Sequence, residues 1–162
     1  PDSGGTGPGL DDAALIPREG GFDVFTTDHL RAFTSDPWLM ARVAAIHAMG
    51  DIWAMGGQVD RALAHLPLPP MRDEMRASTI AEIMAGARRA FDPCGGRIVG
   101  GHTAIGAELS IGFTVTGLCE SDPITLAGGQ PGDVLILTKP LGSGTPHTDW
   151  LAWYSTQPLP AK

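Results

Sequence analysis

The spacing of apolar and polar positions predicts a long helix near the middle of the chain. The segment from Asp36 to Met55 carries apolar residues around most of the helical circumference, which predicts a largely buried helix over 37–55. Asp36 is suited to cap the first turn, and Pro37 to occupy the first helical position. The two glycines at 56–57 then supply the expected C-terminal stop.

A second helix is predicted over 71–90, because Met75, Thr79, Ile83 and Ala87 recur there at helical spacing. Alternating or β-branched runs between the turn-forming segments predict the strands. The order of the elements predicts an α+β fold, with helices on one face of a mixed or mostly antiparallel sheet. The predicted strands cover residues 22–27, 59–66, 97–99, 108–118, 124–126 and 133–138.

Composition and charge narrow the class of protein. The chain has 162 residues and a formal charge of −7, which argues against a nucleic-acid-binding surface. No run of about 18 apolar residues is present, so no transmembrane helix is expected. The two cysteines, Cys94 and Cys119, indicate neither a disulfide framework nor a zinc site. We therefore expect a cytoplasmic protein without a signal peptide.

Acidic residues in apolar or glycine-rich surroundings are the first candidates for chemistry. Asp51 lies in the predicted apolar helix, where an unpaired charge is costly, and His47 precedes it by one turn on the same face. Two interpretations stay open: a metal or ligand site, or a helix carboxylate that caps a neighbouring loop or pairs with an arginine such as Arg42. Asp28 follows a predicted strand, where functional carboxylates are often displayed. Asp12 taken alone is more typical of a turn or a helix cap.

A glycine pair after the predicted strand 97–99 is the second candidate. Gly100, Gly101, His102 and Thr103 together suit a turn whose backbone N–H groups bind an anion, although an ordinary tight turn has the same pattern. Lys139 lies beside another glycine-rich segment, where it suits either a phosphate contact or a solvated strand end. Neither of the usual glycine-rich nucleotide-binding patterns is present.

The order of several short motifs closely resembles that of the selenophosphate synthetase (selenide, water dikinase) family, within the aminoimidazole ribonucleotide synthetase-like superfamily. The resemblance covers about residues 10–145. The narrower segments, GGHT and LTKPLGSG, favour this family over thiamine-phosphate kinases and hydrogenase-maturation relatives. The matching segments are LDDAAL, TTDHL, DPWLMARVAAIHAMGDIWAMGG, IVGGHT, FTVTGL and PGDVLILTKPLGSG.

The resemblance implies roles for individual residues. It implies that Asp12, Asp28 and Asp51 hold Mg²⁺ on the phosphates of ATP, and that Asp28 also belongs to the nucleotide site. It implies that residues 100–103, GGHT, contact the phosphates. No catalytic residue is assigned within this chain. The implied substrates are ATP and selenide, the implied assembly is a homodimer, and the wording of two motifs resembles versions fused behind an NADH-dehydrogenase-like flavoprotein domain.

The resemblance also implies a division of the chain and shows departures from the family pattern. We expect a flexible lead-in at 1–9, an ATP- and metal-binding domain at 10–128, the start of a truncated second domain at 129–145 and a divergent tail at 146–162. The family's upstream cysteine or selenocysteine segment has no counterpart here, and His47 stands where the family usually has an amide. We therefore expect an incomplete enzyme. The alternatives are another ATP-dependent kinase or ligase of the superfamily, and a non-catalytic dimerisation remnant.

Overall fold

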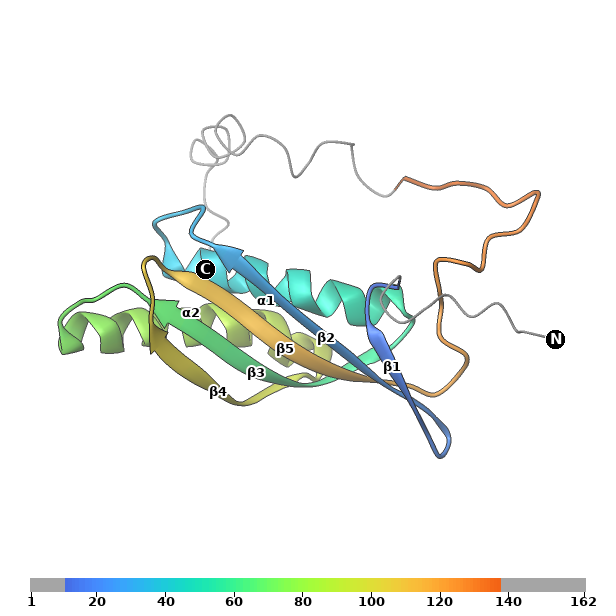
Figure 1. Ribbon diagram of the computed structural model, residues 1–162, viewed down its shortest axis with the longest axis horizontal. Coiled ribbons are helices and arrows are strands. Elements are labelled where there is room, and N and C mark those ends of the chain that lie inside the picture. Colours follow the sequence, from blue (N-terminus) through green and yellow to red (C-terminus); the bar gives the residue numbers. More distant parts are fainter. Residues whose placement is uncertain (1–10, 138–162) are drawn as a thin grey trace. The chain divides into compact units, whose positions relative to one another are not determined.

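The computed structural model describes residues 11–137, which divide between a first unit ending at Gly128 and a second beginning at Gly129. All of the helices and strands in this range belong to the first unit (Figure 1). The functional division predicted at 128/129 stays a prediction, and the lead-in 1–9 and the tail 146–162 lie outside the described residues. In chain order the elements are β1 (Ala14–Arg18), β2 (Gly21–Arg31), α1 (Pro37–Ala54), β3 (Gln58–Leu68), α2 (Asp73–Phe91), η1 (Asp92–Cys94), β4 (Arg97–Ile105) and β5 (Ser110–Cys119).

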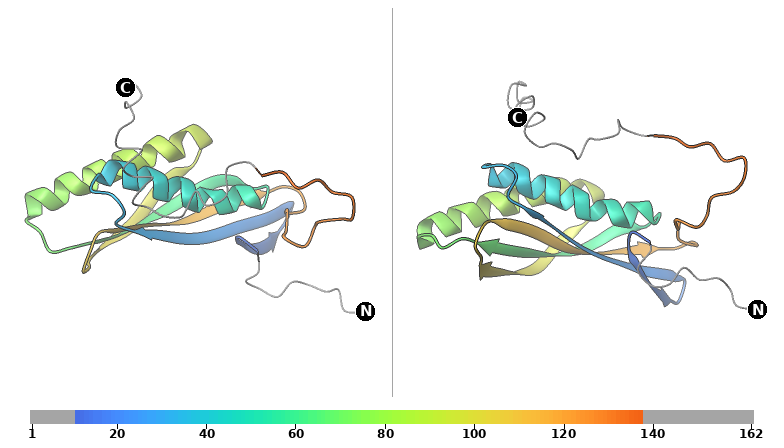
Figure 2. Two further views of the ribbon diagram at one scale, coloured as in Figure 1. Left: turned by 90° about the horizontal axis from the view of Figure 1, so that it is seen from above. Right: turned by 45° about the horizontal axis from the view of Figure 1, so that its top comes forward.

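The first unit is one sheet covered by helices on a single face. The strand order is β1-β2-β5-β3-β4, in which β3 and β4 are parallel and the other neighbours are antiparallel. Figure 2 shows α1 and α2 side by side on the same side of this sheet. The predicted α+β class, with a mixed sheet and helices on one face, is therefore confirmed. The other face of the sheet, here called the open face, has no covering element among the described residues.

Helix α1 begins as the sequence predicts. The carboxylate of Asp36 accepts a hydrogen bond from the N–H of Leu39 at 3.0 Å, and Pro37 occupies the first turn. Its buried side is rich in alanine, which lets the helix lie close to the sheet. The prediction that α1 is buried around most of its circumference is wrong, because the sheet and α2 cover only part of it. Its outward residues Trp38, Val43, Ile46 and Trp53 are 37–42% exposed.

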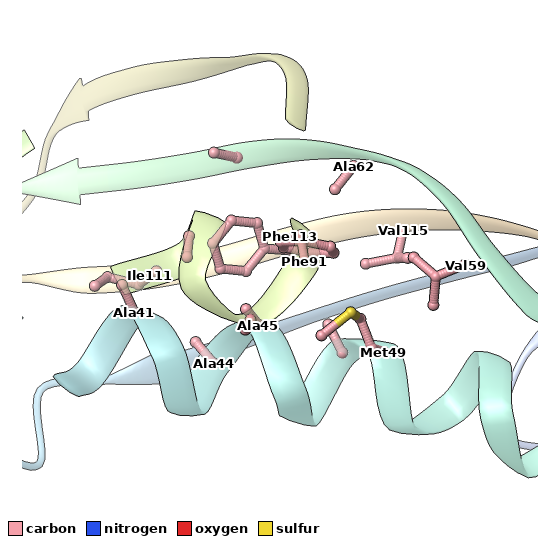
Figure 3. Packing of buried hydrophobic residues seen from close by; sticks show 14 of the residues in the cluster. Ala41, Ala44, Ala45, Met49, Val59, Ala62, Phe91, Ile111, Phe113 and Val115 are labelled. Atoms are coloured by element: carbon pink, nitrogen blue, oxygen red, sulfur yellow. The ribbon is translucent and has the colours of Figure 1, made fainter. Parts of the chain in front are cut away.

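The core lies between the sheet and the two helices. Phe91 of α2 packs edge-to-face on Phe113 of β5, with ring centroids 5.3 Å apart. Helix α2 crosses α1 at Gly86, where a Cβ atom would overlap the carbonyl group of Trp38. The small residue therefore fixes how closely the helices approach. Figure 3 shows the surrounding buried residues Ala41, Ala44, Ala45, Met49, Val59, Ala62, Ile111 and Val115.

Two predicted strands are wrong. Residues 124–126 form no strand, and neither do residues 133–137, the described part of the predicted strand 133–138. Val134 and Leu135 are 81% and 98% exposed. The apolar run is typical of a strand, but a strand needs a hydrogen-bonded neighbour, and the described part of the chain offers none at this point.

Two further strands differ from their predicted form. β4 was expected to stop at 99, but it continues to Ile105 because its backbone pairs in parallel with β3 from Arg61 to Leu68. β1 was not expected, and it pairs with β2 through a turn at Gly20, which has a positive φ of 79°. Neither described helix combines the length and the apolar character needed to cross a membrane.

Candidate functional site

Asp51 and Thr26 meet where α1 lies on β2. Asp51 lies in the last turn of α1, and Thr26 lies in the middle of β2. The hydroxyl of Thr26 donates a hydrogen bond to Oδ2 of Asp51, with 2.6 Å between the oxygens. Asp51 is half-buried, and this hydroxyl is one of its hydrogen-bond partners, whereas the ion pair with Arg42 that the sequence left open is not formed within residues 11–137.

Close packing of α1 on the sheet brings Asp51 to this position. A Cβ atom at Gly117 of β5 would overlap the side chain of Ile52, the residue that follows Asp51. Gly57, just beyond the helix, also approaches Ile52 closely. Glycine at these positions therefore lets Ile52 sit against the sheet, and Asp51 is carried to the neighbouring strand β2, which pairs with β5.

Asp28 is the second carboxylate of the site. It was expected at the end of a strand, but β2 runs on to Arg31, so Asp28 lies within the strand. It is two residues from Thr26, and side chains two apart in a strand share a face. Asp28 therefore points toward α1, where its Oδ1 lies 4.0 Å from Nε2 of His47. His47 and Asp51 are four residues apart on α1, so helix and strand each contribute two side chains to the cluster.

The surroundings of Asp51 favour its neutral form. Burial is the main cause that raises the pKa of Asp51, and the nearby Asp28 raises it further through a hydrogen bond and through its charge. The hydrogen bond from Thr26 and the charge of His47 act in the opposite direction. A pair of close carboxylates, one of them half-buried, is the kind of site whose repulsion a bound cation relieves.

Asp12 lies just before β1, the strand that pairs with β2, but it does not belong to this cluster. Ala14 pairs with Phe25 of β2, so Asp12 precedes β1 at the edge beside the Thr26–Asp28 stretch. Asp12 is exposed, and over residues 11–137 no three acidic, histidine or cysteine side chains come together as a ready metal site. Its neighbour Asp11 accepts a hydrogen bond from the N–H of Leu126 at 2.9 Å. The structure thus gathers Asp28 and Asp51 and leaves Asp12 apart.

The glycine pair at 100–101 is not a turn. Both residues lie inside β4, and neither has a positive φ. A Cβ atom at Gly101 would overlap the carbonyl group of Ala64 on β3, so close approach of two strands explains this glycine. The predicted tight turn is wrong because β4 stays paired with β3 through both glycines, after an irregularity at Val99, which the pairing skips. Contact of residues 100–103 with phosphate stays a prediction.

The distance across the sheet separates the two candidate regions. Asp28 is opposite Phe113, Phe113 is opposite Ala64, and Ala64 is opposite Gly101. Asp28 and Gly101 therefore lie in one row, three strand spacings or roughly 14 Å apart. A hollow of about 360 Å³ adjoins residues 100–103, and its other walls include Leu66, Ile80 and Met84.

Thr26 was missed by the sequence analysis. Its signal was available, because residues 26 and 28 share a face in any strand that contains both. The predicted strand ended at 27, so this relationship was not used. A longer strand would have placed a hydroxyl and a carboxylate side by side, facing the helix layer.

A family comparison decides where the chain belongs. The family described as AIR synthase related protein, N-terminal domain, matches residues 10–119, which contain β1 to β5, both helices and the Asp28–Asp51 pair. The chain belongs to this family. The resemblance found from the short motifs is therefore confirmed at this level.

Curated relatives of the chain carry one enzyme name. A selenide, water dikinase of Nitratidesulfovibrio vulgaris (strain DSM 19637 / Miyazaki F) is 38% identical over 136 residues, which are 83% of this chain and 38% of that protein. A selenide, water dikinase of Myxococcus xanthus (strain DK1622) is 39% identical over 140 residues, which are 85% of this chain and 39% of that protein. The chain thus spans about two fifths of these relatives.

A solved structure with the same fold is that of AaThiL complexed with AMPPCP and TMP. It matches with a TM-score of 0.64 at 23% identity, over 71% of this chain and 38% of that one. At this identity the likeness concerns the fold. The AIR synthase-like arrangement of sheet and helices is therefore shared with this protein.

Proposed function

We propose that this chain is the ATP- and Mg²⁺-binding part of a selenide, water dikinase, the enzyme that makes selenophosphate from selenide, ATP and water. The family membership, the name of the curated relatives and the motif series support this assignment. The fold neighbour that holds AMPPCP, an ATP analogue, supports nucleotide binding. Because the chain spans about two fifths of the relatives, the complete reaction requires parts beyond the described residues.

The Asp28–Asp51 pair is the observation that carries the proposal. Burial raises the pKa of Asp51, and the neighbouring carboxylate of Asp28 raises that pKa further. Ionisation of Asp51 is therefore unfavourable when no cation is bound between the two carboxylates. Oxygen ligands of this kind suit Mg²⁺, which is usually bound by one or two carboxylates together with substrate phosphates and water. The residues present therefore fit a metal–nucleotide site.

Each acidic residue has a distinct part in the proposed site. Asp28 and Asp51 hold the metal, while Thr26 orients the Asp51 carboxylate by its hydrogen bond. Asp12 joins them only when the segment before β1 moves toward β2, since it is apart from the pair in the structure. Bound Mg²⁺ neutralises charge on the phosphates during phosphoryl transfer. This chain's own contribution is binding and orientation, and we assign it no catalytic residue.

Residues 100–103 are also proposed to contact the nucleotide, but as part of a strand and not as the predicted turn. They present an extended strand edge instead of a turn, and the hollow beside them has mainly apolar walls from β3 and α2. One nucleotide that touches both Asp28 and Gly101 has to extend across three strands, roughly 14 Å.

A homodimer that pairs two open faces is also proposed. Phe25, Leu63 and Val99 are 36%, 49% and 56% exposed, and they lie together beside a hollow of about 350 Å³ on the sheet. Apolar side chains on an uncovered sheet face are normally buried by a second layer. A second copy of the same sheet supplies such a layer at the usual spacing of about 10 Å. The fusion to a flavoprotein domain and the cytoplasmic location stay predictions from the sequence.

A thermal-shift experiment tests the nucleotide–metal site. The melting temperature of the chain is measured alone, with ATP, with Mg²⁺ and with both, beside Asp51→Asn and the exposed control Glu82→Gln. We expect a rise that needs both ligands, persists in the control and is lost in Asp51→Asn. At a hundredfold excess over Kd, binding stabilises the folded chain by about 2.7 kcal/mol. A folded chain that shows no shift contradicts the proposal.

The same assay separates the main alternative within the family. Thiamine monophosphate is added to the chain with ATP and Mg²⁺, because the fold neighbour was solved with TMP. No additional shift is expected for a selenide, water dikinase. An additional shift that Glu82→Gln retains favours a thiamine-phosphate kinase instead, and the absence of every shift favours a non-catalytic dimerisation unit.

A further inference from the structure

Residues 123–126, here called the strap, pass the C-terminal end of α1. The N–H of Ile124 donates a hydrogen bond to the carbonyl of Met55, the residue that caps α1, with 3.0 Å between nitrogen and oxygen. Carbonyl groups at a helix end lack partners within the helix, and this bond satisfies that of Met55. Gly56 lies against the same strap residue, since a Cβ atom there would be 3.2 Å from Cδ1 of Ile124. The strap is therefore attached to the end of the helix whose last turn holds Asp51.

The other attachment of the strap is to Asp11. The N–H of Leu126 donates a hydrogen bond to Oδ1 of Asp11 at 2.9 Å. The side chains of Ile124 and Leu126 are 63% and 71% exposed, so burial of apolar surface contributes little to holding the strap in place. These two backbone hydrogen bonds connect the end of α1 to the segment just before β1.

The register of β1 on β2 shows where Asp12 would point if the strand began earlier. Ala14 is opposite Phe25, so continuing the antiparallel pairing by two residues would place Asp12 opposite Thr27. Directly opposed residues of neighbouring strands point to the same face. Thr27 immediately precedes Asp28 on β2 and therefore points to the other face of the sheet, the open face. In a longer β1, Asp12 would thus point away from the carboxylate pair.

The chain avoids this outcome by bending before β1. Residues 11–13 form a bend, and the strand begins only at Ala14. Asp11 lies in that bend and is the residue bonded to Leu126 of the strap. The bond therefore holds the segment in a form in which Asp12 is free of the strand register.

We propose that Asp11 is a positioning residue for the metal site. Its hydrogen bond to the strap keeps Asp12 out of the sheet, in a segment that can move toward Mg²⁺ held by Asp28 and Asp51. This inference rests on the proposed function, which gives Asp12 a part in that site. Asp11 acts here as a hydrogen-bond acceptor and not as a metal ligand, so a neutral side chain with an acceptor oxygen should replace it. The inference also gives a role to residues 124–126, which form no strand.

Isothermal titration of the chain with Mg²⁺-ATP tests this role in Asp11→Ala, Asp11→Asn and Asp12→Asn. Removing a residue that orients a metal ligand typically weakens metal binding by tenfold or more, so we expect about a tenfold loss in Asp11→Ala. Asp11→Asn keeps an acceptor for the Leu126 N–H and should bind within about twofold of the native chain. Asp12→Asn should lose at least as much affinity as Asp11→Ala.

A double variant distinguishes positioning from direct binding. If Asp11 acts through Asp12, adding Asp11→Ala to Asp12→Asn should cause no further loss of affinity. The proposal is overturned if the two losses multiply, or if Asp11→Asn binds as weakly as Asp11→Ala, because the second result would make the Asp11 carboxylate itself a ligand.

A measurement without ligand separates this inference from the proposed function. Nitroxide labels on Asp12→Cys and Ala54→Cys, in a Cys94→Ser background, report the distance between the segment before β1 and the end of α1 by double electron–electron resonance. Cys94 is replaced because it is exposed, whereas Cys119 is buried and stays. We expect a narrow distribution with Asp11 or Asn at position 11, and a broader or shifted one in Asp11→Ala.

The two experiments fail in different ways. A native chain that does not bind Mg²⁺-ATP contradicts the proposed function, and the label distances then still decide whether Asp11 sets the position of residue 12. An unchanged distance distribution in Asp11→Ala overturns the inference even where Mg²⁺-ATP binds as proposed.

Discussion

Thr26 of β2 and Asp51 of α1 are joined by a hydrogen bond of 2.6 Å, and this bond connects the helix layer to the sheet at the candidate site. Nothing in α1 itself favours a carboxylate there, because the negative end of the helix dipole lies in the last turn, which holds Asp51. Its presence is therefore better explained by what it binds than by the stability of the helix.

Removing the Thr26 hydroxyl is expected to destabilise the chain at neutral pH. A hydrogen bond to a charged group contributes about 1.5–3 kcal/mol, so Thr26→Val should lower the free energy of unfolding by about that amount. Because Thr26 lowers the pKa of Asp51, the variant should also raise that pKa further. Urea unfolding at pH 7 measures the first effect, with Thr26→Ser as the control that keeps a hydroxyl. Equal stability of the three proteins would contradict the expectation.

Asp51→Asn is expected to raise the stability of the metal-free chain at neutral pH. Burial raises the pKa of Asp51 above its ordinary value of 3.8, so the folded state holds this proton more tightly than the unfolded state. The stability contributed by that proton is present below pH 3.8 and is lost as pH rises through the raised folded pKa. Asn cannot titrate, so the advantage of the variant over the native chain should appear between pH 4 and pH 7.

Urea unfolding in EDTA at both pH values measures this difference. Addition of Mg²⁺ and ATP should then reverse the order at pH 7, because only the native chain gains ligand stabilisation. A variant that is less stable than the native chain at pH 7 without metal would show that the Asp51 carboxylate serves the fold.

The crossing of the two helices predicts opposite effects for two glycine-to-alanine substitutions. Gly86→Ala places a methyl group against the Trp38 carbonyl and should cost about 1–3 kcal/mol through overpacking. Gly50→Ala, in α1, meets nothing within 4 Å and should stabilise by roughly 0.5–1 kcal/mol through helix propensity. Thermal unfolding of both variants checks the pair, and a loss of stability in Gly50→Ala would contradict the packing described for α1.

The open face predicts the effect of charge on assembly. Leu63→Arg introduces a cation at the centre of the proposed dimer interface and should convert a dimer to a monomer. Met75→Arg is the matched control on α2, since the two side chains are 49% and 51% exposed. Sedimentation velocity at micromolar concentration distinguishes the two states. Dissociation by both substitutions, or by neither, would argue against pairing through the sheet.

Local signals predicted much of the fold. The Asp36 cap, Pro37 and the glycines at 56–57 place α1 within one residue of its observed bounds, because these residues satisfy or break helical hydrogen bonds directly. Local signals did not predict where β4 ends. Gly100 and Gly101 disfavour a strand by composition, yet pairing with β3 extends the strand through both of them. The opposite error was made at 134–137. These apolar residues favour a strand by composition, but they form none, because they have no described neighbour to pair with.

The candidate site was predictable in part. Asp51 stood out as a charge in an apolar helix, and it does lie against the sheet beside Asp28. The partner strand was not predictable from helical spacing, because the approach of β2 to α1 depends on Ile52 packing against Gly117, about 65 residues further along the chain. The position of Asp12 depends likewise on β1, which the motif series did not reveal.

The central place of β5 has a consequence for the order of events during synthesis. Among the five strands of residues 11–137 this one is synthesised last, and in the described sheet it alone lies between β2 and β3. A nascent chain can therefore form its helices and the β3–β4 pair early, but the sheet remains in two pieces until Ser110–Cys119 has emerged. Any fragment cut before residue 110 retains every acidic residue of the candidate site and loses the strand that supports Thr26 and Asp28 against the helix.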